Sequence, residues 1–277
     1  MRTIQTAKPR PDLSKFVLVY GHREMECTGA PFSQPDCSAL EQGIGFNFDG
    51  QTTLNRPDGR SRVAPKAYIF GGLTSPCGSQ SFSGHVRSFA IFLRPLSFWP
   101  LFRIPSSVLM NKEYDAEDLL GPEILDLWSK LAECRTFQER IFAAERYLIP
   151  VASRAGGRTL IAKTAHHMLD RNGTIRIGEI ADHAGLSVRQ YERRFVEEVG
   201  LTPKTFARTR RFQRALDAKR FFPQRTWLCI AHEFGYFDQM HMVRDFQILG
   251  GDAPGNLLDQ SGDLQPWSLP PLQVLER

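Results

Sequence analysis

Three charged side chains that could hydrogen-bond to base edges lie close together at Arg189, Glu192 and Arg193. A guanidinium can donate two parallel hydrogen bonds to guanine, and a carboxylate can accept one from the amino group of cytosine. These residues could therefore read a nucleic-acid sequence if one helix presented them on one face. The alternative for the same residues is the charged, solvated face of an ordinary helical hairpin.

The segment that contains them, residues 177–195, has the spacing of a helix-turn-helix unit. Ala181 lies four positions before Gly185; a small side chain lets two helices cross closely, and glycine can adopt the left-handed conformation of the turn. Ser187 and Gln190 form a capping box, which predicts that a helix starts directly after the turn. Packing of the two helices turns their apolar residues inward and leaves the charged residues outward. The inward positions are Ile180, Ala184, Leu186, Tyr191 and Phe195.

The same spacing returns 50 residues later, at Ala231 and Gly235. Asp238 is suited to cap the helix that follows. Residues 203–222, which open with a proline that a first helical turn tolerates, predict one long connecting helix between the two units. Two such units on one chain can occupy successive major grooves if their reading helices lie about 34 Å apart.

Positive charge is concentrated in the same part of the chain. The 277 residues carry a net charge of +5, and the pI is about 9.0. Residues 171–222 contain 12 Lys plus Arg against 6 Asp plus Glu, whereas the rest of the chain contains 23 against 24. This distribution is typical of a nucleic-acid-binding domain, although a solvated basic face has the same count. The residues expected to contact the DNA backbone are Arg210, Arg211, Arg214 and Arg220.

The N-terminal half has a different pattern. Residues 16–20, 43–48, 66–72 and 86–93 read as strands separated by turns, which predicts a β-sandwich or barrel up to about residue 110. Aromatic residues are dense from Phe82 to Phe102, either as barrel core or as the lining of a pocket for an apolar effector.

Residues 115–150 change to helical spacing, with a capping box at Thr136 and Glu139. The capping box marks the start of a second helix, so two amphipathic helices are expected in this range. They could close the core of the β-domain or form a subunit interface. Residues 151–158 are predicted to be the linker, residues 159–260 a helical domain, and residues 261–277 a poorly ordered tail.

The order of these motifs resembles the AraC/XylS family of transcription regulators over residues 160–257. The resemblance rests on IAxxxGLSxRxxxRxFxxxxGxTP at 180–203, an Arg and an Ala at 211 and 215, and IAxxxGYxDxxHMxRxF at 230–246. Residues 251–257 depart from the family because they lack its closing aromatic-Arg pair. By resemblance, the base-contacting residues are Arg189, Glu192 and Arg193 in the first unit and Met240, His241 and Arg244 in the second.

The resemblance implies an α+β chain: a cupin-like β-barrel with two helices over residues 1–150, then two helix-turn-helix units joined by a long helix. It implies a sequence-specific regulator, activator or repressor, whose N-terminal domain binds an effector, dimerises, or both. The expected partner is double-stranded DNA. RNA polymerase, a small-molecule effector of unknown class and a second copy bound through residues 115–150 are further candidates.

Other classes of protein lack support in the residues. No signal-like segment and no run of about 18 apolar residues occurs, which predicts a cytoplasmic, nucleoid-associated protein. Five scattered cysteines and the lack of an HxH pair predict no metal and no cofactor. An enzyme is therefore not expected. The alternatives are a cupin-type catalyst, a DNA-repair enzyme with a helix-turn-helix domain, and an adaptor that does not bind DNA.

Overall fold

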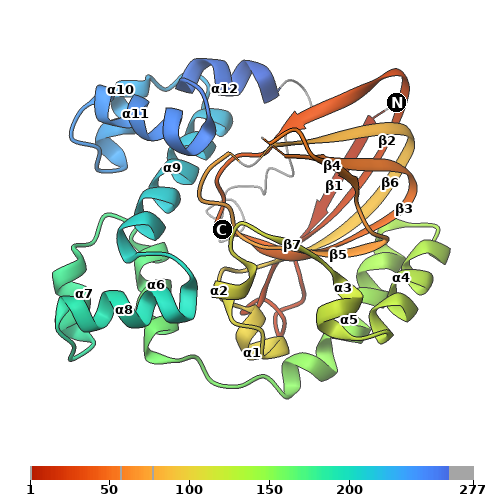
Figure 1. Ribbon diagram of the computed structural model, residues 1–277, viewed down its shortest axis with the longest axis horizontal. Coiled ribbons are helices and arrows are strands. Elements are labelled where there is room, and N and C mark those ends of the chain that lie inside the picture. Colours follow the sequence, from red (N-terminus) through yellow and green to blue (C-terminus); the bar gives the residue numbers. More distant parts are fainter. Residues whose placement is uncertain (1, 57, 77, 262–277) are drawn as a thin grey trace.

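The computed structural model describes residues 2–56, 58–76 and 78–261. Its N-terminal part is one antiparallel sheet in the order β1-β2-β6-β3-β5-β7, with β4 paired to β3. The long strands bend at irregularities in register, so the sheet curls (Figure 1). It is nevertheless open, with β1 and β7 as its edges. The strands are β1 (Arg2–Ala7), β2 (Val17–Pro35), β3 (Gln42–Asn55), β4 (Ser61–Val63), β5 (Ala67–Phe70), β6 (Ser79–Leu93) and β7 (Glu113–Asp115).

Both faces of this sheet are covered, which explains why its strands are apolar without alternation. On β6, Phe89 and Ile91 belong to a core that also contains buried residues of the helices that follow the sheet. Ala90 and Phe92, on the opposite face, form a smaller cluster with Leu18 and its neighbours. The strands are also longer than the apolar segments from which they were predicted: β2 extends to Pro35, and β6 begins at Ser79.

The helices of the N-terminal half are α1 (Phe98–Phe102), α2 (Ser106–Leu109), α3 (Ala116–Leu120), α4 (Glu123–Glu133) and α5 (Phe137–Ser153). The first part of the helical spacing predicted over residues 115–150 is divided into two helices, because Gly121 takes a φ of 84° and Pro122 follows it. The capping box of Thr136 and Glu139 is confirmed.

Helix α5 continues through Pro150 to Ser153, so the first three residues of the predicted linker, 151–158, are helical. Buried residues of α4 and α5 join the main core of the sheet, which confirms that these helices close that core. The predicted tail lies outside the described residues except for Ser261.

The C-terminal half is helical, as predicted. Figure 1 shows two helical units at opposite ends of the long helix α9, beside the curled sheet. The helices are α6 (Leu160–Asp170), α7 (Ile177–His183), α8 (Val188–Val199), α9 (Pro203–Phe221), α10 (Trp227–Glu233), α11 (Gln239–Gly250) and α12 (Pro254–Ser261). The predicted fold class is confirmed. In the described part of the chain, no helix has both the length and the apolar character needed to cross a membrane.

Each helical unit has its own core, but the first is not built from the C-terminal half alone. Leu40, Leu96 and Met110 of the N-terminal half are buried together with Ile180, Tyr191 and other residues of α6 to α9. The loop between β2 and β3 also reaches the second unit, where the Ser38 amide donates to the carbonyl oxygen of Leu249 at 2.9 Å. The two halves of the molecule are thus packed directly on each other.

Candidate nucleic-acid interface

The first helix-turn-helix unit consists of α7, the turn at Gly185 and α8. Gly185 has a φ of 65°, the left-handed conformation that its position requires. The Ser187 hydroxyl accepts a hydrogen bond from the Gln190 amide at 3.3 Å, and the Gln190 side-chain oxygen accepts one from the Ser187 amide at 3.0 Å. These local bonds fix where α8 begins and hence which residues occupy its first two turns.

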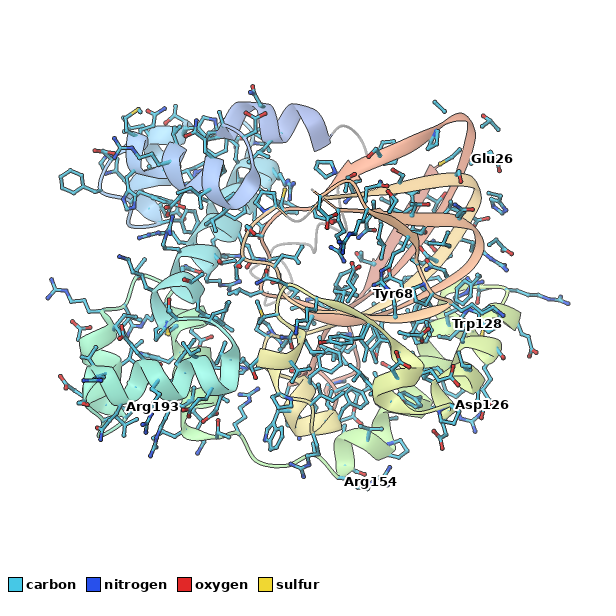
Figure 2. The ribbon with its side chains drawn as sticks, in the orientation of Figure 1. Glu26, Tyr68, Asp126, Trp128, Arg154 and Arg193 are labelled. Atoms are coloured by element: carbon cyan, nitrogen blue, oxygen red, sulfur yellow. The ribbon has the colours of Figure 1, made fainter. Side chains whose placement is uncertain are left out.

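The opposite faces of α8 differ as the residue pattern predicts. Tyr191 and Phe195 are fully buried, and the Tyr191 hydroxyl donates to the Thr164 hydroxyl of α6 at 3.0 Å. Arg189, Glu192 and Arg193 are exposed. Arg193 forms an exposed ion pair with Glu197, at 3.7 Å, and lies on the side of the molecule away from the sheet (Figure 2).

The second unit, α10 and α11, contains one more residue in its turn. One residue lies between Gly185 and the cap Ser187, whereas two lie between Gly235 and the cap Asp238. Gly235 is again left-handed, with a φ of 70°, and Asp238 accepts from the His241 amide at 2.6 Å. Matching the two caps makes Met240 equivalent to Arg189 and Arg244 equivalent to Arg193.

The predicted contact residues of α11 fall into two groups. Met240 is 58% exposed and Arg244 is exposed. The ring of His241 instead supports the turn. Its Nδ1 accepts a hydrogen bond from the Phe237 amide at 3.4 Å, and it packs nearly perpendicular to the ring of Tyr236, with 5.4 Å between the ring centroids. His241 thus takes the place that Gln190 has in the first unit.

The comparisons with known proteins agree with this architecture. A helix-turn-helix domain model of the AraC type matches residues 180–260. The chain therefore contains a helix-turn-helix domain of the AraC type over these residues. Among solved structures, ToxT from Vibrio cholerae is similar at 11% identity over 93% of this chain and 98% of that chain, with a TM-score of 0.50. An apo form of a ToxT variant gives 11% identity, 92% and 99% coverage and the same TM-score. At this identity the likeness shows a shared fold. No curated protein sequence matches.

Two of the four arginines expected to contact DNA phosphates are buried inside the molecule. Arg210 is 7% exposed and donates from Nε to the carbonyl oxygen of Leu169 at 3.3 Å. Arg214 is 4% exposed and donates to the side-chain oxygen of Asn172 at 3.2 Å. Phosphate contact was expected because α9 is rich in Arg, but α9 packs on several sides and these two arginines brace it against the end of α6. Their assignment to the DNA backbone is therefore corrected.

The other two arginines of that set are half-buried. Arg211 lies over the ring of Tyr236 at 4.6 Å and donates to the carbonyl oxygen of Gly235 at 3.3 Å, so it holds the second turn. Arg220 lines a cavity between α9 and the β2–β3 loop, where burial lowers its pKa. A role of either residue at the DNA backbone stays a prediction.

A buried carboxylate, Asp245, is the structural residue that sequence reasoning missed. It is 3% exposed on the inner face of α11. Its Oδ1 accepts from Nη2 and Nε of Arg208 at 2.7 and 3.1 Å, and its Oδ2 lies 3.5 Å from Nη2 of Arg211. The signal was available: an acid among the apolar positions Met242, Phe246 and Leu249 needs cationic partners, and the preceding helix is rich in arginine.

The positive surface of the C-terminal domain is consequently smaller than the charge count implies. Of the 12 basic residues between 171 and 222, the six on α9 from Arg208 onward are buried or partly buried. The exposed ones come from the first unit and the start of α9. They are Arg171, Arg176, Arg189, Arg193, Arg194 and Lys204.

The unusual end of the second unit still completes its core. Leu257 of α12 is 4% exposed and belongs to the cluster that contains Phe212 and Phe246. A Cβ on Gly250 would lie 2.4 Å from a Leu257 methyl group, which shows how closely α12 packs on the end of α11. Leu257 thus packs at the point where the family's aromatic-Arg segment is missing.

Proposed function

We propose that this protein is a transcription regulator that binds a specific DNA sequence through both α8 and α11, and that its N-terminal domain binds a small-molecule effector, dimerises, or both. The observation that carries the proposal is the pair of reading helices, each started by a side-chain cap and each presenting its outer face to solvent. Figure 1 shows the two units at opposite ends of α9. This arrangement is suited to binding two successive segments of the major groove on one side of the DNA.

The base-contacting residues proposed for this function are Arg189, Glu192 and Arg193 on α8 and Met240 and Arg244 on α11. All five are exposed, and all lie within the first two turns of their helices. His241 is the weaker member of the predicted set, because its ring is already engaged in the turn.

An effector site is supported by two neighbouring cavities. One, of about 140 Å³, lies against the face of the sheet that bears Tyr68, Phe70 and Phe92. The other, of about 190 Å³, lies between the β2–β3 loop and α9. Both are lined by Glu41, and the lining they share also includes Asp36, Ala39 and Gln80. A ligand on the sheet would thus lie close to the helix that joins the reading units. The dense aromatic segment divides accordingly: Phe89 and Phe98 are core, whereas Phe92 lines the cavity.

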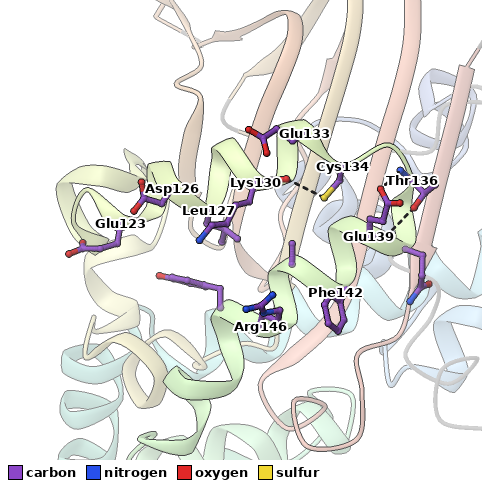
Figure 3. Close-up of a pocket in the computed structure, with 13 residues that line it drawn as sticks. Glu123, Asp126, Leu127, Lys130, Glu133, Cys134, Thr136, Glu139, Phe142 and Arg146 are labelled. Carbon is purple, nitrogen blue, oxygen red and sulfur yellow. Dashed lines mark hydrogen bonds between the residues drawn. The ribbon is translucent and has the colours of Figure 1, made fainter.

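Dimerisation through residues 115–150 is supported by the outer surface of α4 and α5. A groove of about 990 Å³ runs between them, with Leu127, Phe142 and Arg146 among its lining residues (Figure 3). Phe142 is 63% exposed, which is unusual for a residue of that size. Phe142→Ala should shift the protein toward monomer in sedimentation experiments, and an unchanged distribution would contradict this interface.

Selection of bound sequences from random duplex DNA, with the full chain, tests the central proposal. We expect two preferred half-sites about one helical turn apart, bound at least about 10³-fold more tightly than scrambled DNA at physiological salt. Equal affinity for selected and scrambled duplexes would show that the protein binds DNA without reading it. Absence of any salt-dependent binding would instead favour the adaptor hypothesis.

A further inference from the structure

The turn of the second unit presents an apolar side chain to solvent. Phe237 is 88% exposed, the largest fraction among the large apolar side chains of the described residues, and Met240 is 58% exposed three positions later. Phe237 is one of the two residues between Gly235 and the cap Asp238, where the first unit has a single residue. A single exposed apolar side chain is common on protein surfaces, but Phe237 and Met240 lie close together in sequence at the start of α11 and offer apolar area that a bound molecule can cover.

The backbone on both sides of Phe237 is held in place. Before it, the Tyr236 amide donates to the carbonyl oxygen of Ala231 at 2.9 Å, and the Gly235 carbonyl oxygen accepts from Arg211. Its own amide donates to His241, and the next residue, Asp238, caps α11. Little conformational entropy is therefore lost when the phenyl group is covered.

The position of these side chains selects the partner. Phe237 immediately precedes the cap of α11, Met240 lies in its first turn, and Arg244 follows one turn later on the same face. The N-terminal part of a reading helix is the part that enters the major groove. In that groove, the methyl group of thymine is the apolar feature of the base edges. The equivalent position to Met240 in the first unit is Arg189, which can only read polar edges.

We propose that Phe237 and Met240 form an apolar reading patch that recognises thymine methyl groups. The half-site under α11 would then be specified by thymines, and the half-site under α8 by hydrogen bonds to guanine and cytosine. The patch is continuous with the exposed Arg244, so the DNA that Arg244 contacts is also the DNA that covers Phe237. This inference rests on the proposed function, because it assigns the chemistry of one of its two half-sites.

Replacing thymine by deoxyuridine removes only the methyl group, and so tests the patch. In the selected duplex, each thymine of the second half-site is replaced in turn, and the Kd of the full chain is measured. We expect the affinity to fall about fourfold for each methyl group that contacts the patch, which corresponds to the burial of one methylene-sized group. The double variant Phe237→Ala, Met240→Ala should bind the thymine duplex more weakly and show no further loss with deoxyuridine.

Two controls separate the outcomes. Phe222→Ala removes another exposed phenyl group, just after α9 and outside the proposed patch, and should keep the full deoxyuridine effect. Deoxyuridine in the first half-site should have the same effect on the wild type and on the double variant. If the wild type binds both duplexes equally, or the double variant keeps the fourfold loss, the patch does not read thymine although sequence-specific binding stands. If no duplex is selected at all, the proposed function fails and this inference fails with it.

Discussion

Arg193 and Arg244 hold the same place in the two units, six residues after the caps Ser187 and Asp238. Both are exposed. Arg193→Ala should cost roughly 1–3 kcal/mol at one preferred base pair and relax the choice of base there, since a bidentate contact is lost. Arg244→Ala should do the same in the other half-site. Profiles of selected sequences measure this, and variants that keep the wild-type preferences but bind all DNA more weakly would identify these arginines as phosphate contacts.

Asp245 is a buried residue whose carboxylate neutralises the charges of Arg208 and Arg211. Asp245→Asn should lower the free energy of unfolding by about 3 kcal/mol, because two cations then lose their buried counter-charge. Urea denaturation measures the effect. Glu197→Gln, which breaks the exposed pair with Arg193, is the matched control and should change stability by less than about 1 kcal/mol. Equal effects of the two substitutions would mean that Asp245 contributes little.

Among the elements, α9 matters most for DNA binding, because its basic residues have two different roles: some face solvent and others hold the helix in the core. Lys204 is exposed in its first turn, whereas Arg214 is buried in its middle. Lys204→Ala should reduce the slope of log affinity against log salt concentration by about one unit, since one phosphate contact and its released counterion are lost. Arg214→Ala should leave that slope unchanged and lower stability instead. A reduced slope in the Arg214 variant would restore it as a phosphate contact.

At the scale of the whole molecule, the N-terminal half contributes to the core of the first reading unit. Leu40, Leu96 and Met110 are buried against that unit. A fragment of residues 158–260 should still fold and bind DNA, because each unit keeps most of its own core, but its melting temperature should be lower than that of the full chain. Circular dichroism and DNA binding check this. A fragment without helical signal, or without affinity for DNA, would show that the two halves fold as one unit.

The contact between the two halves also contains a carboxyl group with a shifted pKa. Burial raises the pKa of Asp217, on α9 beside the β2–β3 loop, to about 7, and the nearby Glu41 acts in the same direction. The folded chain therefore holds a proton that the unfolded chain releases near pH 4. The stability that this proton provides is complete below about pH 4 and is lost as the pH rises through 7.

Comparison of the wild type with Asp217→Asn isolates this effect from the other titrating groups. The urea midpoint of the wild type should fall between pH 5 and pH 8 relative to that of the variant, which cannot lose the proton. The two proteins should differ most at pH 8, where the variant is the more stable. Parallel curves over this range would contradict a raised pKa.

Sequence alone determined the features that depend on neighbours along the chain. The caps at Ser187, Asp238 and Thr136, the left-handed glycines of both turns and the outward face of α8 all follow from interactions within about one or two helical turns. The two reading units were therefore predictable together with the residues that they expose.

Tertiary structure decided everything that depends on what packs against an element from elsewhere. The arginines of α9 are internal because α6, the second turn and the β2–β3 loop surround that helix, and helical spacing does not reveal how many sides of a helix are covered. Asp245 is a structural residue only because Arg208 and Arg211, more than 30 positions away in sequence, reach it. The sharing of a core between the two halves depends on the same kind of long-range contact. Periodicity describes a side chain's direction relative to its own helix, and burial depends on the rest of the fold.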